Sequence, residues 1–143
     1  MDIRPITDSF AVAPQIYPDD FVLLADAGFT TIICNRPDSE VPQDLGSDAM
    51  RAAAEASGLT FVFNPVSGPA LAETSVDIQG DAVVSSKGPV LAYCASGTRS
   101  AAVWALSQAG RAETETLLTA LRQAGYALDG LRPQLEVLAA RVT

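Results

Sequence analysis

The most informative absence in this 143-residue chain is histidine, which does not occur at all. Without an imidazole, neither Ser-His-Asp nor Cys-His catalysis is available. Zinc sites with histidine ligands are excluded too, and the two cysteines are too few for a site made of thiolates alone. Cysteine chemistry in this chain must therefore activate its thiol without a histidine base, and we expect neither a metal nor an organic cofactor.

The chain is also short of positive charge and of long apolar runs. Its formal net charge is -8, which repels the phosphates of nucleic acids and the headgroups of anionic membranes, so we expect neither as a partner. No apolar run approaches the roughly 20 residues of a membrane span, and the N-terminus lacks the pattern of a signal peptide. We therefore expect a cytoplasmic protein in which Cys34 and Cys94 are reduced thiols. A small anionic substrate would have to be attracted by a local site, against the overall charge.

The remaining composition is that of one packed globular domain covering residues 1–143, with 48% hydrophobic and 18% charged residues. Apolar, β-branched runs alternate with helical segments that stop at glycines. The expected strands are Phe10–Ala13, Thr30–Cys34, Leu59–Phe63 and Val90–Tyr93. The expected helices are Asp19–Ala27, Ser47–Ser57, Glu73–Ser86, Thr98–Ala109, Glu113–Ala124 and Leu131–Val142, and the segments 35–46 and 67–72 are expected to be loops. This alternation predicts an α/β fold in which one central, mostly parallel sheet carries helices on both faces.

The segment with the clearest chemical signal runs from the last expected strand into the next helix. Its residues between the strand and the helix are Cys94, Ala95, Ser96 and Gly97, followed by Thr98, Arg99 and Ser100. Ligands of open α/β sheets bind at the carboxyl ends of strands, where this order places Cys94. Gly97 tolerates the backbone angles that let successive amides curl around one point, and the helix adds about half a positive charge there. We therefore expect residues 94–100 to form an anion-binding loop.

Two residues beyond Cys94 complete this expected site. Arg99 offers a planar fork of donors for an oxyanion, and a cation beside a thiol at a helix N-terminus favours the reactive thiolate. Ser100 is expected either to hydrogen-bond the sulfur or to cap the helix. The alternative is that Cys94 is an inert cysteine buried for packing alone. The spacing Cys-x-x-Gly-x-Arg-Ser after an apolar strand favours the functional interpretation.

Several segments of the chain together resemble a bacterial family, the phosphatase-like domain of beta-lactamase-hydrolase-like proteins, which is related to dual-specificity tyrosine phosphatases. They are Phe10–Gln15, Ala27–Phe29, Ile33–Glu40, Asn64–Val66, Tyr93–Ser100 and Ala124–Tyr126. The Asn-Arg-Pro-Asp stretch and the cysteine loop are the specific parts. The resemblance implies a three-layer fold of the protein-tyrosine-phosphatase type and a cysteine nucleophile.

The sequence departs from the tyrosine-phosphatase pattern at three places. Four residues separate Cys94 from Arg99, where tyrosine phosphatases have five, and this shorter spacing is similar to the persulfide loop of rhodaneses. Tyr93 stands where phosphatases usually have histidine. The loop after Asn64-Pro65, where a proton-donating aspartate is expected, reads Val66-Ser67-Gly68-Pro69-Ala70, and Glu73 is the nearest carboxyl group. A missing general acid typically costs about 10² to 10⁴ in rate.

Three further residues are candidates for a supporting role. Arg36 follows a strand and should lie at the same sheet edge as Cys94, either as a second anion contact or as a loop arginine paired with Asp38 or Glu40. Cys34 ends that strand and is either a redox partner of Cys94 or a buried core thiol. Glu73 is either an acid near the site or simply the start of a helix.

These observations leave three functions open. The first is a cysteine-dependent phosphatase-like hydrolase, in which Cys94 attacks phosphorus while Arg99 and the loop amides hold the oxygens. The second is a rhodanese-like sulfurtransferase with a persulfide on Cys94, favoured by the loop length. The third is an anion-binding module without turnover, which the missing acid permits.

Overall fold

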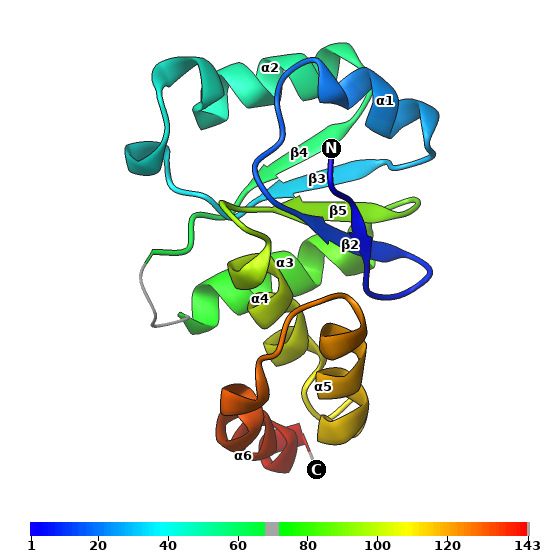
Figure 1. Cartoon of the computed structure of the whole chain (residues 1–143), viewed down its shortest axis with the longest axis vertical. Coiled ribbons are helices and arrows are strands. Elements are labelled where there is room, and N and C mark those ends of the chain that lie inside the picture. Colours follow the sequence, from blue (N-terminus) through cyan, green and yellow to red (C-terminus); the bar gives the residue numbers. More distant parts are fainter. Residues whose placement is uncertain (68–71, 143) are drawn as a thin grey trace.

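A five-stranded sheet runs through the centre of the computed structural model, which describes residues 1–67 and 72–142 (Figure 1). The strands are β1 (Arg4–Pro5), β2 (Phe10–Ala13), β3 (Thr31–Cys34), β4 (Thr60–Phe63) and β5 (Val90–Tyr93). Their order across the sheet is β1-β2-β5-β3-β4. Strand β1 pairs antiparallel with β2, and the other neighbours pair in parallel. The expected mostly parallel central sheet is confirmed.

Helices cover both faces of this sheet, which makes three layers (Figure 1). They are α1 (Asp20–Asp26), α2 (Ser47–Ala56), α3 (Glu73–Ser85), α4 (Thr98–Gln108), α5 (Thr114–Gln123) and α6 (Arg132–Val142). Three short 3₁₀ turns are η1 (Asp38–Glu40), η2 (Gln43–Leu45) and η3 (Asp129–Leu131). Helices α1 and α2 pack on one face, whereas α4, α5 and α6 share the core of the other face with side chains of α3.

The alternation of side chains along the strands explains why both faces are covered. In β5, Leu91 and Tyr93 point into the core under α1 and α2, while Val90 and Ala92 point into the core under α4. All four are at most 1% exposed. A strand that is apolar on both faces must be buried on both, which is the usual state of parallel sheets.

Two parts of the secondary structure differ from the sequence expectation. Strand β1 has no apolar pattern, because it is two residues long at the sheet edge, where Pro5 is tolerated. The segment expected to be a loop at 35–46 contains the turns η1 and η2. Helix α3 forms despite Gly80, where a Cβ would lie 3.6 Å from the Cβ of Ser107 in α4, an ordinary contact distance.

The carboxyl ends of four strands lie in line at one edge of the sheet. Tyr93 stands opposite both Ala13 and Cys34, and Cys34 stands opposite Phe63. The residues that come directly after these strands therefore meet at the same edge, which is where the site is built. No helix in the described part of the chain is long and apolar enough to cross a membrane.

Candidate active site

The loop after β5 turns sharply into α4 at a glycine. Gly97 has a φ of 95°, in the left-handed region, and α4 begins at the next residue, Thr98. A side chain at this backbone position would be strained, because L residues other than glycine rarely adopt such angles. The turn carries the chain from the buried strand directly into the helix N-terminus, as the sequence predicts.

The sulfur of Cys94 lies inside this turn. The backbone N–H of Gly97 donates a hydrogen bond to Cys94 Sγ over 3.1 Å. Cys94 is fully buried, and it is a free cysteine. The sulfur thus faces a peptide donor and the first turn of an eleven-residue helix, whose unpaired N–H groups carry partial positive charge.

Arg99 lies in the first turn of α4, and Glu40 and Val66 hold its guanidinium. Its Nη1 and Nη2 donate to the two carboxylate oxygens of Glu40, both over 2.8 Å. Nη1 also donates to the carbonyl oxygen of Val66 over 2.8 Å. The pKa of Arg99 is raised, first by the hydrogen bond with Glu40, and attraction to the sulfur of Cys94 adds to the shift although burial opposes it.

The ion pair with Glu40 uses the edge of the guanidinium formed by Nη1 and Nη2, and it does not use the edge that carries Nε. A guanidinium has donors at Nε and at both terminal nitrogens, arranged as two forks. Within the described residues, Glu40 and Val66 accept hydrogen bonds from Nη1 and Nη2 of Arg99 and not from its Nε. The Nε edge of the guanidinium is therefore not used by the contacts with Glu40 and Val66.

Glu40 is a site residue that the sequence analysis named only as a salt-bridge partner for Arg36. Its pKa is lowered, first by the hydrogen bond from Arg99 and further by Arg36, so the group is a carboxylate at neutral pH. Burial of the side chain, which is 34% exposed, works against this shift. The Arg-x-x-x-Glu spacing at 36–40 was the available signal, but nothing local connects it with Arg99.

Arg36 contacts Glu40 and Gln15, and no hydrogen bond joins it to Cys94 in the part of the chain that the structure describes. Its Nε donates to Glu40 Oε1 over 3.3 Å and its Nη1 donates to Gln15 Oε1 over 3.1 Å. The backbone N–H of Gln15 in turn donates to the carbonyl of Ala95 over 3.2 Å. Arg36 therefore supports both Glu40 and the segment that holds the start of the cysteine loop.

A buried polar cluster, which no local sequence pattern predicts, lies next to the cysteine loop. Asn35 Nδ2 donates to Gln79 Oε1 and to Ser100 Oγ over 2.8 and 2.9 Å. Asn64 Nδ2 donates to Asn35 Oδ1 over 2.9 Å. Each of these four side chains is at most 1% exposed. The backbone N–H of Val66 donates to the carbonyl of Asn35, so the same cluster also places the carbonyl that holds Arg99.

The other residues of the loop have distinct surroundings. Ser100 is buried and accepts from Asn35, and among the described residues no hydrogen bond joins it to the sulfur. Ser96 Oγ donates to Thr98 Oγ1 and accepts from the N–H of Thr98, so this exposed side chain covers the start of α4. Ala95 is exposed and contributes its carbonyl to Gln15.

Cys34 lies in the core under α1 and α2, and it is unoxidised. It is 4% exposed, and its thiol donates to the carbonyl of Arg36 over 3.4 Å. Burial raises the pKa of this thiol. Its surroundings are those of a core cysteine.

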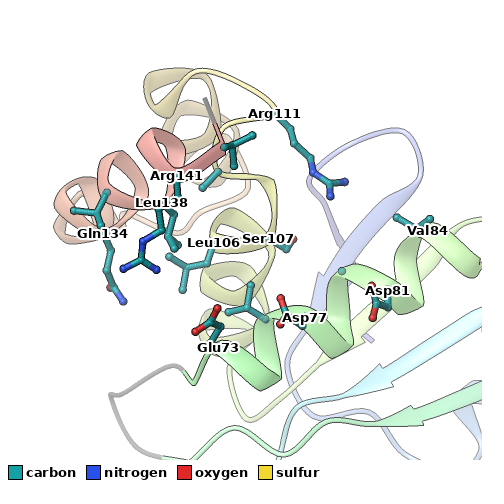
Figure 2. Close-up of a pocket in the computed structure, with 15 residues that line it drawn as sticks. Glu73, Asp77, Asp81, Val84, Leu106, Ser107, Arg111, Gln134, Leu138 and Arg141 are labelled. Carbon is teal, nitrogen blue, oxygen red and sulfur yellow. The ribbon is translucent and has the colours of Figure 1, made fainter.

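Glu73 begins α3 and is exposed. It lines a groove of about 500 Å³ between α3, α4 and α6, together with Asp77, Leu138 and Arg141 (Figure 2). This groove does not include Cys94 or Arg99. The loop after Asn64-Pro65, where the phosphatase pattern has an aspartate, lies partly outside the described residues, since these omit 68–71. Within the described residues, no cluster of three or more His, Cys, Asp or Glu side chains could hold a metal ion.

Comparison with solved structures assigns the fold to the protein-tyrosine-phosphatase class. PTPMT1 in complex with PI(5)P superposes with a TM-score of 0.77 at 12% identity, covering 100% of both chains. A phosphatase candidate from Neisseria meningitidis Z2491 gives a TM-score of 0.81 at 28% identity, covering 96% of this chain and 99% of that one. The expected fold type is confirmed.

The sequence comparisons identify the family. The family described as "Beta-lactamase hydrolase-like protein, phosphatase-like domain" matches residues 2–111, and the chain belongs to it. The beta-lactamase hydrolase-like protein of Xylella fastidiosa strain Temecula1 is 38% identical over 108 residues, which is 76% of this chain. The aligned part is 25% of that relative, so the chain spans about a quarter of its length.

Proposed function

We propose that this phosphatase-like domain hydrolyses phosphate monoesters through a covalent intermediate on Cys94. The observation that carries the proposal is the hydrogen bond from the Gly97 N–H to Cys94 Sγ, in a loop where the contacts of Arg99 with Glu40 and Val66 do not use its Nε edge. A peptide donor and a helix N-terminus are the surroundings that keep a cysteine in its nucleophilic thiolate form without a histidine.

In the first step the thiolate attacks phosphorus, an S–P bond forms, and the ester P–O bond breaks. The leaving oxygen departs with the bonding electron pair and takes a proton from water or solvent. In the second step water attacks phosphorus, the S–P bond breaks, inorganic phosphate leaves, and the thiolate returns. The Nε edge of Arg99 and the loop amides hold the equatorial oxygens in both steps, where they stabilise the charge of the transition state.

Glu40 and Val66 contribute by fixing the direction of Arg99. A free arginine side chain has many rotamers, and binding an anion in one of them costs entropy. The two carboxylate contacts and the carbonyl contact settle this orientation before the substrate arrives.

The chain favours substrates whose leaving group needs no proton. Glu40 is the carboxylate at Arg99, but its lowered pKa leaves it ionised and unsuited to donate a proton at neutral pH. The sequence from Val66 to Ala72 contains no acidic residue. We therefore expect aryl phosphates, whose phenolate is a good leaving group, to react faster than alkyl phosphates. A phosphate ester is supported as the ligand class by the fold neighbour PTPMT1, which was crystallised with PI(5)P.

The short Cys-x₄-Arg spacing favours a second candidate, sulfur transfer through a persulfide on Cys94. A tighter ring of amides has less room for a tetrahedral phosphate. In this alternative a sulfane sulfur moves from a donor such as thiosulfate to Cys94, sulfite leaves, and an acceptor thiol or cyanide then takes the sulfur.

One paired assay tests both candidates. The purified chain, its Cys94→Ser variant and the matched Cys34→Ser variant receive an aryl phosphate, an alkyl phosphate and, separately, thiosulfate with cyanide. Phosphate release from the aryl ester that is lost only in Cys94→Ser is the expected result. Thiocyanate formation dependent on Cys94 would replace the proposal with sulfur transfer. Phosphate or vanadate binding with neither product would leave an anion-binding module and overturn the proposed turnover.

A further inference from the structure

The peptide between Ser96 and Gly97 is hydrogen-bonded on both of its sides. Its N–H, from Gly97, donates to Cys94 Sγ over 3.1 Å. Its carbonyl, from Ser96, accepts a hydrogen bond from Tyr126 Oη over 3.2 Å. In a planar trans peptide the C=O and N–H point in opposite directions, so fixing one fixes the other. By donating to the carbonyl, the hydroxyl of Tyr126 therefore helps to orient the N–H of the same peptide toward the sulfur of Cys94.

The local chain does not settle this direction unaided. Gly97 has a φ of 95° and no side chain, and glycine occupies several backbone regions at little cost. A rotation of the Ser96–Gly97 peptide would turn its carbonyl toward the sulfur and its N–H away. An oxygen in that place would repel a thiolate and a bound anion. A donor that holds the carbonyl on the opposite side opposes this rotation.

Tyr126 is fixed closely against this peptide. A Cβ built on Gly97 would collide with the hydroxyl of Tyr126 and would lie 2.9 Å from its Cζ. Tyr126 is 6% exposed, and its backbone N–H donates to Leu121 at the end of α5 over 2.8 Å. The guanidinium of Arg4 lies 5.2 Å from the centre of its ring. Burial raises the pKa of the phenol, so its hydroxyl keeps its proton and remains a donor at neutral pH.

We propose that Tyr126 is a positioning residue for the cysteine loop, whose hydroxyl holds the Ser96–Gly97 peptide with its N–H directed at Cys94. The residue lies beyond residues 2–111, which the family match covers. A hydrogen bond to the carbonyl also polarises the peptide and strengthens its N–H as a donor. The effect of Tyr126 on turnover rests on the proposed phosphatase function, whereas its effect on the sulfur does not.

The experiment titrates the thiolate of Cys94 by ultraviolet absorbance, which needs no reagent to enter the buried site. Cys34→Ala serves as the background, so that one thiol remains. In this background Tyr126→Phe removes the hydroxyl and keeps the ring, and Tyr17→Phe is the matched control, because Tyr17 is 55% exposed. We expect Tyr126→Phe to raise the pH midpoint of thiolate formation by about one unit, the size of one hydrogen bond to a charged group. The control should leave it unchanged.

Two further readouts separate positioning from mere stability. Urea unfolding of both variants shows whether the hydroxyl matters only to the fold. At a pH below both midpoints, kcat/KM for an aryl phosphate should fall about tenfold in Tyr126→Phe if the midpoint shifts by one unit, because the thiolate fraction there falls tenfold. An unchanged midpoint in Tyr126→Phe, with or without lower stability, would overturn the proposal. If the midpoint shifts while the parent chain releases no phosphate, the proposed function fails and the positioning role stands.

Discussion

Cys34 and Cys94 stand at the same edge of the sheet, each at the carboxyl end of a parallel strand, and Cys34 is in register with Tyr93. The chain takes a different course beyond each cysteine. After Cys34 the chain leads to the extended residue Pro37 and a short 3₁₀ turn, and the thiol donates to the backbone carbonyl of Arg36. After Cys94 it turns at Gly97 into a helix, and the sulfur accepts an N–H. The position at a strand end is shared, so the turn and the helix are what distinguish the candidate nucleophile from the core thiol.

The two arginines repeat this contrast. Arg36 and Arg99 both contact Glu40, with side chains 23% and 21% exposed. Arg99 comes from the first turn of the helix behind the sulfur, whereas Arg36 comes from the segment after the other cysteine and reaches Gln15. The two arginines are therefore similarly exposed and share Glu40 as a partner, but their expected roles differ. Arg99 is expected to bind the substrate anion, and Arg36 is expected to support Glu40.

The largest expected effect compares the two cysteines directly. Cys94→Ser should lower kcat/KM for an aryl phosphate by about 10⁴-fold or more, because the nucleophile is lost. Cys34→Ser should change it by about twofold or less, because the thiol of Cys34 donates to the carbonyl of Arg36, outside the cysteine loop. Steady-state phosphate release measures both. Comparable losses in the two variants would break the distinction between the two thiols.

The next effect compares the two arginines. Arg99→Lys replaces a planar fork by a point charge and should lower kcat/KM by about 10²- to 10³-fold. Arg36→Lys should cost about threefold or less, since partly exposed ion pairs contribute little. The inhibition constant of vanadate, measured on both variants, should rise mainly in Arg99→Lys, because vanadate binding weakens there. Equal weakening in Arg36→Lys would make Arg36 a second anion contact.

Asn35 joins the two segments, because it comes directly after Cys34 and donates to Ser100 of the other loop. Asn35→Leu removes the partners of Gln79 and Ser100 while keeping a similar volume. We expect a loss of about 2 to 4 kcal/mol in the free energy of unfolding, the cost of leaving buried polar groups unpaired. Gln43→Leu, on an exposed turn, is the control and should stay within about 0.5 kcal/mol. A urea titration that gave both variants the same stability would show that the cluster does not tie the segments together.

The smallest effect is the pH dependence of the Glu40 pair. The lowered pKa of Glu40 means that its contribution to stability is present above its unfolded value, about 4.5, and is lost as the pH falls through the lower folded value. Glu40→Gln lacks this contribution, so the stability difference from the parent should be about 0.5 kcal/mol at neutral pH and shrink below pH 4.5.

Unfolding curves from neutral to acid pH measure this difference, with Glu55→Gln on the exposed face of α2 as the control. A difference for Glu40→Gln that grows as the pH falls would contradict the assigned sign.

Much of the fold could be predicted from the sequence because its signals are local. Gly28, Gly58 and Gly125 have positive φ and each stands two residues after the last residue of a helix, as expected of glycine stops. The strand Val90–Tyr93 was predicted residue for residue, because an apolar run bounded by Pro89 and the cysteine loop has clear ends. Strand β1 gave no such signal, because it is defined by the pairing of Arg4 with Val12 in the folded structure and not by a pattern of its own residues.

The candidate site likewise contains some residues that a local sequence pattern indicates and others that only the folded structure brings together. Cys94, Gly97 and Arg99 all lie in the short segment 94–99, so their spacing could be interpreted without a structure. Glu40 meets Arg99 across 59 residues and Asn35 meets Ser100 across 65, and no local pattern records such contacts. The buried amide side chains were missed for a further reason, because asparagine at a strand end also favours ordinary turns.

The most direct test of Cys94 as the nucleophile is to trap the phosphoryl group on its sulfur. The chain is mixed with an aryl phosphate, quenched within a single turnover, digested and examined by mass spectrometry of the peptide that contains Cys94. We expect a phosphocysteine at Cys94 that is absent from the Cys94→Ser variant and forms at the rate of phenol release. Phenol release at full rate from Cys94→Ser, or a phosphoryl group on another residue, would contradict it.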